Sequence, residues 1–256
     1  MVASEPKWWE KHDEDDLSGF DPYSLTAIGM EWLDDTGRES IEHSAPHSLQ
    51  RAQALAAWLE HRYAFRMIAD CMTSMVERLL KHTPSNDFWK IWVVCGSPTT
   101  QTIRVTEPGE LVVQLDYDPS ALLHASDLER KRALIDLIEA ASRVAERQSD
   151  TDLSNLRKAC AEVREQGYRN EWIWGEAISP NGRIARIVVS HDTISLKIYA
   201  LIFEPDGALI AKKLLIDERP YGSDVWHRHL GDIRWDSEER AVFVNNHDGR
   251  ELYIDI

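Results

Sequence analysis

The last third of the chain, residues 171–256, constrains the fold most strongly. Apolar residues alternate there with polar ones, as at Ile194, Leu196 and Ile198. Turn sequences recur roughly every 8–12 residues, at 179–182, 190–193, 204–207 and 246–249. A spacing of two is typical of strands with one buried face, and closely spaced turns join antiparallel neighbours. We therefore expect one antiparallel β-meander over about 171–256.

Three helices are predicted upstream of this region. The first spans about 48–82, where one apolar stripe runs from Ala52 to Leu79 and Ser48 is placed to cap the start. The second spans 127–148, because Ser126 and Glu129 form a capping-box sequence. The third spans 152–166, with Thr151 as its expected N-cap and Gly167 as its end.

The remaining apolar runs predict strands at 89–95, 102–105 and 111–115, the last two forming a hairpin. Helices and strands in this order predict an α+β fold. We expect an acidic, aromatic-containing N-terminal segment, residues 1–46, followed by a single α+β domain, residues 47–256. Because the helices at 127–148 and 152–166 each need a sheet face to cover, we expect the helical middle and the C-terminal sheet to share one core.

The chain is strongly acidic. Its net charge is -15 over 256 residues, and residues 1–46 alone hold 12 acids against 3 Lys and Arg. Such a chain repels nucleic acid and anionic membranes, because both are polyanions. The charge therefore favours a basic protein partner, although acidity that serves only solubility is an alternative.

The N-terminal segment is the predicted partner-binding surface, because its aromatic rings offer contact area and its acids steer the encounter. A solvated arm without a partner is the alternative. A weaker candidate is the segment 221–232. The predicted partner-binding residues are Trp8, Trp9, Asp13, Glu14, Asp15, Asp16, Asp34, Asp35, Trp226 and Asp232.

One cluster suggests metal chemistry. His227 and His229 would point to the same side of an extended segment, and Asp232 follows. The sequence is similar to the HxHxDH motif of metallo-β-lactamase-like hydrolases, but the Asp falls one position late and the adjacent His is missing. A metal-dependent hydrolase using His227, His229 and Asp232 is therefore the alternative function. Otherwise the sequence contains no phosphate-binding loop and no nucleophile elbow, so we expect no cofactor and no catalysis.

The cysteines and the N-terminus bear on location. Cys71, Cys95 and Cys160 are odd in number and far apart, which is typical of free thiols in a reducing compartment. The sequence shows no signal peptide and no apolar run long enough to span a membrane. We therefore expect a cytoplasmic protein.

The stretch Leu115–Ser120, which leads into a capped helix, stands in a chain that is acidic, α+β and rich in Trp, with 10 such residues. In these features the chain resembles the immunity proteins of bacterial polymorphic-toxin and contact-dependent growth inhibition systems. The resemblance implies that the protein binds a basic cognate toxin, such as a nuclease, in a 1:1 complex and covers its active site. It assigns no role to individual residues. A regulatory interaction module is a further alternative.

Overall fold

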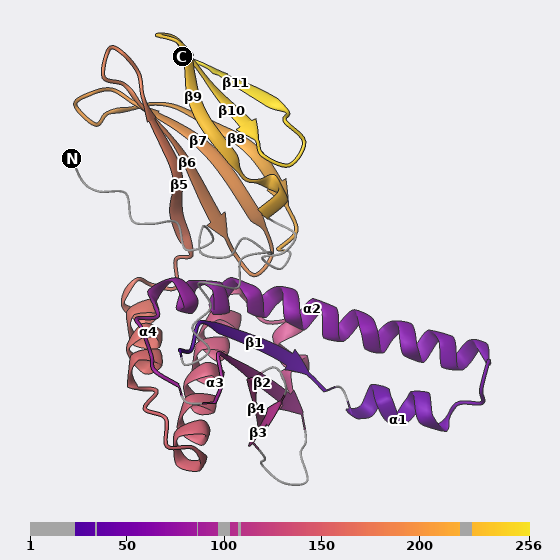
Figure 1. Ribbon diagram of the computed structural model, residues 1–256. Helices are drawn as coiled ribbons and strands as arrows, with labels where there is room; N and C mark the ends of the chain where they lie inside the picture. Colours follow the sequence, from indigo (N-terminus) through magenta and orange to yellow (C-terminus); the bar gives the residue numbers. More distant parts are fainter. Residues whose placement is uncertain (1–23, 34, 86, 97–102, 107–108, 221–226) are drawn as a thin grey trace.

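The computed structural model describes residues 24–33, 35–85, 87–96, 103–106, 109–220 and 227–256, with the backbone alone for 35–37 and 227. These residues form two packed units, a helical unit with a small sheet and an all-β unit (Figure 1). Helices and antiparallel strands are both abundant, so the predicted α+β class is confirmed.

The first unit is built on a four-stranded sheet. Its strands are β1 (Ala27–Trp32), β2 (Lys90–Gly96), β3 (Ile103–Thr106) and β4 (Glu110–Asp116), in the order β1-β2-β4-β3. β1, β2 and β4 are parallel, and β3 is antiparallel to β4, as the predicted hairpin requires. Parallel neighbours need a long crossover. Here α1 (Asp35–His43) and α2 (Leu49–Leu79) form the crossover between β1 and β2.

The helices begin and end close to the predicted positions. Ser48 accepts a hydrogen bond from Arg51 N at the start of α2, and the capping box of Ser126 and Glu129 opens α3 (Asp127–Gln148). A short 3-10 helix, η3 (Pro119–Leu123), precedes α3. The strongest local signals in the sequence are therefore confirmed.

The predicted Thr151 cap is wrong. The last helix, α4 (Ser154–Glu165), begins later than expected, and its N-cap residue Leu153 makes no side-chain capping bond. Instead, Leu153 N donates to Glu146 Oε1 over 2.8 Å and Ser154 N donates to Asp152 Oδ1 over 2.8 Å. A carboxylate from the preceding helix thus takes the place of the expected hydroxyl, which no local pattern indicates.

The second unit contains two antiparallel sheets and not one meander. β5 (Glu171–Ile178), β6 (Ile184–His191), β7 (Leu196–Phe203) and β8 (Leu209–Glu218) pair in sequence order. After the short 3-10 helix η4 (His227–His229), β9 (Gly231–Ser237), β10 (Arg240–Asn245) and β11 (Glu251–Asp255) form a separate three-stranded sheet. Both sheets contribute to one core, because the inner face of each needs an apolar cover.

Two tryptophans join these sheets. Trp174 Nε1 on β5 donates to Gly231 O over 3.0 Å, and Trp235 Nε1 on β9 donates to Ala177 O over 3.1 Å. The split into two sheets was not foreseen, because alternation within a strand does not say which neighbour the strand pairs with.

The buried apolar residues form two clusters, one in each unit, where the sequence predicts a single shared core. The helices α3 and α4 do cover a sheet, but it is the sheet of the first unit, where Leu134, Ile138 and Leu156 are buried with Val93 and Val113. The expected boundary at residue 46 also differs from the structure, since β1, from the N-terminal segment, is an edge strand of that sheet.

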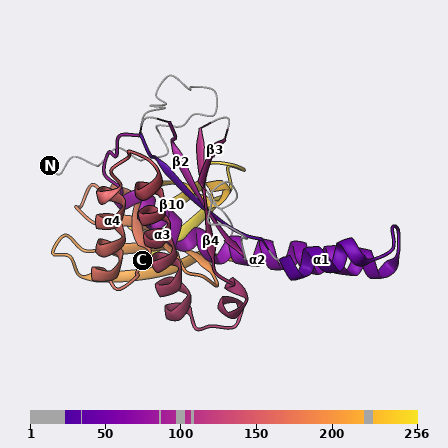
Figure 2. The same ribbon diagram turned by 90° about the horizontal axis from the view of Figure 1, so that it is seen from below.

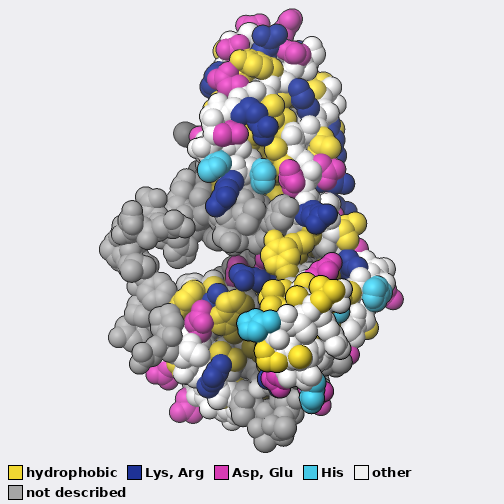
Figure 3. Space-filling view, turned by 90° about the vertical axis from the view of Figure 1, so that its right-hand side faces the viewer, with side chains coloured by type: hydrophobic (Ala, Val, Ile, Leu, Met, Phe, Trp, Pro, Cys, Tyr) yellow, Lys and Arg dark blue, Asp and Glu magenta, His cyan; other side chains and the backbone are white. Residues whose placement is uncertain are grey.

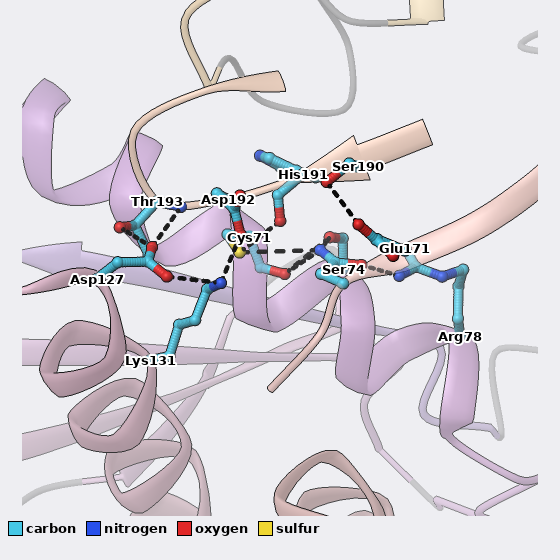
Figure 4. A network of polar contacts seen from close by, with 11 residues as sticks. Cys71, Ser74, Arg78, Asp127, Lys131, Glu171, Ser190, His191, Asp192 and Thr193 are labelled. Atoms are coloured by element: carbon cyan, nitrogen blue, oxygen red, sulfur yellow. Dashed lines mark hydrogen bonds and ion pairs between the residues drawn. The ribbon is translucent and has the colours of Figure 1, made fainter. Parts of the chain in front are cut away.

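Polar contacts join the two units where α2 and α3 meet the ends of β5 and β6 (Figure 4). Lys131 Nζ on α3 lies 2.8 Å from Asp127 Oδ2 and 2.5 Å from Asp192 Oδ1. Asp127 in turn accepts hydrogen bonds from Thr193 N, at 3.2 Å, and Thr193 Oγ1, at 2.7 Å. We call this network the joint.

The second half of the joint is centred on Asn170. Its Nδ2 donates to Cys71 O and its Oδ1 accepts from Arg78, both on α2. Cys71 Sγ donates to His191 O over 3.0 Å. The joint thus fixes the two units to each other through at least three elements of the chain, which gives them a defined relative orientation.

His191 is an unusual member of the joint. Its side chain is 0% exposed, and neither ring nitrogen hydrogen-bonds to any residue that the structure describes. Burial lowers the pKa of His191 to about 3, and the nearby charges of Arg78 and Lys131 act in the same direction. The imidazole is therefore neutral at physiological pH.

Candidate functional site

Most of the predicted partner-binding residues lie outside the described residues. These are Trp8, Trp9, Asp13, Glu14, Asp15, Asp16, Asp34 and Trp226. Asp35 begins α1, but its side chain is not described. Asp232 is exposed on β9, in the other unit. The predicted surface therefore stays a prediction.

Residues 227–232 do not have the extended geometry that the predicted metal site requires. Residues 227–229 form a 3-10 helix and not an extended segment. Because such a helix has about three residues per turn, positions 227 and 229 do not face the same side. Among the residues whose side chains are described, no group of three or more His, Cys, Asp or Glu could hold a metal ion.

The three cysteines lie inside the two-unit body. All three are free and buried, and burial raises the pKa of each of the Cys71, Cys95 and Cys160 thiols to about 12. They are therefore thiols and not thiolates at physiological pH. This environment is typical of structural cysteines.

The clearest candidate site is the outer face of the sheet β5–β8, which points away from β9–β11. The inward residues of β6 and β7, such as Ile187 and Ile198, are fully buried, whereas the outward residues are half-buried or exposed. A sheet with one solvated face normally carries polar side chains on that face. Here most of the outward side chains are apolar.

The outward side chains form four rows across the four strands, defined by the pairing register. The row nearest the joint is polar, and of the other three, two are apolar and enclose one charged row. The distal row, near the hairpin turns, is Ile178, Ile184, Phe203 and Leu209. The proximal row, nearer the joint, is Ile173, Val188, Tyr199 and Leu214, and the charged row between them is Glu176, Arg186, Leu201 and Lys212.

The apolar rows are open to solvent at the sheet edges. Ile178 is 66% exposed and Ile173 is 54% exposed, and Leu209 and Leu214 on the opposite edge are exposed as well. Exposed apolar side chains gathered on one face of a folded protein are typical of an interaction surface. We call the two apolar rows, together with the charged row between them, the sheet face.

The charged row is held in place by contacts within the sheet face. Arg186 Nε lies 2.5 Å from Glu176 Oε2, and its guanidinium lies 5.1 Å from the ring of Phe203. Lys212 Nζ lies 4.2 Å from the ring of Tyr199. These contacts lay the long side chains of Arg186 and Lys212 over the rings of Phe203 and Tyr199, so the apolar rows are most open at the sheet edges.

Sequence reasoning identified these strands but missed the sheet face. The signal was present, since β7 (Leu196–Phe203) carries apolar residues on both faces, as in Tyr199, Leu201 and Phe203 beside Ile198 and Ile202. A strand that is apolar on both faces predicts a cover on both. The second cover is what a partner would supply.

Comparisons with known proteins give no further guide to the site. No family model matches the chain, and neither a curated protein nor a solved structure matches it significantly. None of the helices in the described residues is long and apolar enough to span a bilayer.

Proposed function

We propose that this protein is a cytoplasmic binding protein that recognises a basic protein partner through the sheet face. In the form that the sequence suggests, it is an immunity protein, and the partner is a toxin whose active site it covers. The observation that carries the proposal is the pair of apolar rows left open to solvent at the edges of the sheet β5–β8. The inner face of its two central strands, β6 and β7, is buried within the second unit, so the outer face is the one on which these strands can meet a partner.

The composition of the sheet face suits tight protein binding. Binding energy at protein interfaces is concentrated in a few large side chains, with Tyr and Arg enriched among them. Tyr199, Phe203 and Arg186 lie near the centre of the sheet face, and Ile173 and Ile178 lie at its edge. Burying each apolar side chain fully contributes about 1.5–3 kcal/mol, so a few of them suffice for stable binding.

The charge of the chain favours a basic partner. The net charge of -15 gives the protein an overall negative potential at long range. Such a potential speeds the encounter with a cationic protein and repels nucleic acid. A nuclease has a cationic substrate groove because it binds a polyanion, so it is the kind of toxin that this potential would attract.

The test is capture of the partner with a matched pair of variants. The tagged protein is expressed in its native cells, and bound proteins are identified by mass at low and moderate salt. The double variant Leu209→Gln and Leu214→Gln removes apolar area from one edge of the sheet face. The control Ile194→Gln replaces an exposed residue in a turn of the same unit, which is 65% exposed.

We expect one basic protein, retained in near-equal amount by wild type and control, and reduced at least about tenfold by the double variant. Adding the purified protein should then block the partner's enzymatic activity. A partner that binds without losing activity would indicate a regulatory module. A partner retained equally by the double variant would exclude the sheet face.

A further inference from the structure

The chain links the two units at one place among the described residues. The first unit holds the described residues up to 165 and the second unit holds those from 171 onwards, so residues 166–170 form the crossing. Each unit has its own cluster of buried apolar residues. Figure 3 shows the units as two bodies, one above the other, and in Figure 2 the strands of the second unit lie behind α3 and α4. Separating the units therefore does not require either core to unfold.

The crossing has the conformation of a helix end. Gly167 and Tyr168 both have left-handed backbone, with φ of 64° and 60°. Gly167 N donates to Arg164 O over 3.0 Å and Tyr168 N donates to Val163 O over 2.9 Å, and these two bonds end α4. Hinge motions in proteins are absorbed by a few residues in loops and at the ends of helices and strands. The short link between α4 and β5 is a place of this kind.

The hydrogen bonds and ion pairs of the joint can be exchanged for contacts with water. Thr193 N and Oγ1 donate to Asp127 in one half of the joint, where Lys131 also lies 2.5 Å from Asp192. In the other half, Asn170 is held by α2. Because water can replace each partner when the units separate, the net free energy that each bond contributes is small. These bonds therefore resist separation less than a shared apolar core would.

One member of the joint favours separation. The imidazole of His191 is fully buried at the end of β6 that meets the first unit, and neither ring nitrogen bonds to any described residue (Figure 4). A buried polar group without a hydrogen bond costs free energy. When the units separate, water can bond to both nitrogens. The His191 ring therefore acts against the other contacts of the joint even when it is neutral.

The surroundings of the ring also oppose its protonation in the closed joint. The titratable and charged groups around it are Cys71 and Arg78 on α2, Asp127 and Lys131 on α3, Glu171 on β5 and Asp192 after β6. Burial lowers the pKa of His191 most, and the cations Arg78 and Lys131 lower it further. Burial acts to raise the pKa of Asp127, but its bonds to Lys131 and Thr193 lower that pKa overall. Asp127 therefore stays ionised between pH 7 and pH 5, and His191 remains the group whose protonation the closed joint excludes.

We propose that the joint is an acid-sensitive hinge, in which protonation of His191 swings the second unit away from the first about residues 166–170 while both units stay folded. An imidazolium in the closed joint would be a buried charge without a partner, next to the cations Arg78 and Lys131. In the open joint, water solvates it. The open form therefore takes up a proton that the closed form excludes, and opening becomes more frequent as the pH falls.

The size of the effect follows from the two protonation equilibria. The pKa of His191 is about 3 in the closed joint, against 6.5 for a solvated imidazole. A group whose pKa is lowered in the closed form stabilises that form above the higher value, and this stabilisation is lost as the pH falls below it. Between pH 7 and pH 5 the equilibrium constant for opening should rise about 25-fold.

Hydrogen exchange measured by NMR at pH 7 and pH 5, corrected for the intrinsic pH dependence of exchange, tests the proposal. The reporter is the Thr193 amide, because its bond to Asp127 crosses the joint. We expect its opening constant to rise about 25-fold in wild type and in the control His124→Leu, whose imidazole is exposed. In His191→Leu it should change by less than about twofold. The comparison also cancels Glu77, whose pKa is raised to about 7 by burial but whose carboxylate contacts Ile28 N in the first unit.

Two further sets of protons separate hinge opening from other motions. Val93 and Phe243 lie on the central strands of the two units, so their amides report unfolding and should stay at least about 100-fold better protected than Thr193 at both pH values. The side-chain amide of Asn170, which donates to Cys71 O over 2.5 Å, should give the same opening constant as Thr193, because a swing of the whole unit breaks both halves of the joint.

Three results would overturn the proposal. The first is a Thr193 opening constant that is the same at pH 7 and pH 5 in wild type. The second is Thr193 protection equal to that of Val93 and Phe243, which would mean that the joint opens only when the protein unfolds. The third is an Asn170 opening constant that differs from that of Thr193, which would mean that the loop after β6 frays while the units stay together. None of these results bears on the sheet face, which lies outside the joint.

Discussion

The buried imidazole of His191 makes the stability of the protein depend on pH in a way that can be isolated. The side chain is fully buried in the joint, and neither ring nitrogen has a described hydrogen-bond partner. Replacing it by leucine, of similar size, removes the titrating group and keeps the volume. The backbone contacts of residue 191 with Cys71 and Asn170 do not involve the imidazole, so they remain possible in the variant.

The direction in which the free energy of unfolding changes with pH follows from the direction of the pKa shift. The pKa of His191 is lowered to about 3 in the folded state, from 6.5. Between these values the unfolded chain binds a proton that the folded chain excludes, so the free energy of unfolding falls as the pH falls below 6.5. At pH 5 this loss amounts to about 2 kcal/mol, since one pKa unit corresponds to about 1.4 kcal/mol.

The assay is urea unfolding at pH 8 and at pH 5, for wild type, His191→Leu and the control His124→Leu. The carboxylates and the other ionisable groups titrate in all three proteins, so their contributions to the pH dependence of stability cancel in the comparison. We expect wild type and His124→Leu, whose imidazole is exposed, to lose about 2 kcal/mol more than His191→Leu. Equal losses in all three proteins would refute the reasoning, because they would mean that water reaches the His191 ring in the folded state.

Three other predictions concern the fold. Ser126→Ala removes the capping box of α3 and should lower the free energy of unfolding by about 1 kcal/mol in urea unfolding; no change would mean that water caps the helix equally well. Gly29→Ala should lower the melting temperature, at a cost of about 1–3 kcal/mol, because the added Cβ meets the Trp92 ring, and a neutral result would show that the ring is free to move. A thiol reagent should modify the three buried cysteines only as fast as the protein unfolds, and rapid labelling of the native protein would contradict their burial.

The parts of the fold that could be predicted are those fixed by neighbouring residues. The helix predicted at 127–148 has the same bounds in the structure, because its start depends on Ser126 and Glu129, three residues apart. The positions of the strands in the second unit also depend on neighbouring residues. The turns between them, such as the one at Gly207 with a φ of 91°, need a backbone conformation that glycine adopts easily. The predictions that were wrong concerned which elements pair and pack together. The second unit contains two sheets and not one, and the described residues form two cores and not one.

The candidate surfaces also divide into one that neighbouring residues indicate and others that depend on long-range packing. The predicted acidic surface is concentrated in a segment that lies largely outside the described residues. The sheet face and the exposed side of α2 instead consist of apolar residues that the sequence assigned simply to strands and to a helix. Whether Leu59 or Tyr199 is buried depends on what packs against it. That packing depends on residues far along the chain, such as those of β1 and β9.

The sequence by itself determined the secondary structure, the acidity and the two-faced apolar character of β7 and α2. Those properties arise from propensity, capping and side-chain spacing within about ten residues. Only the tertiary structure decided which apolar face each element buries, because burial depends on the long-range pairing of strands and the path of the chain between units. The inner faces of β6 and β7 and the second half of α2 are covered within the chain, whereas no described residue covers the sheet face or the exposed Leu55, Leu59 and Tyr63 of α2.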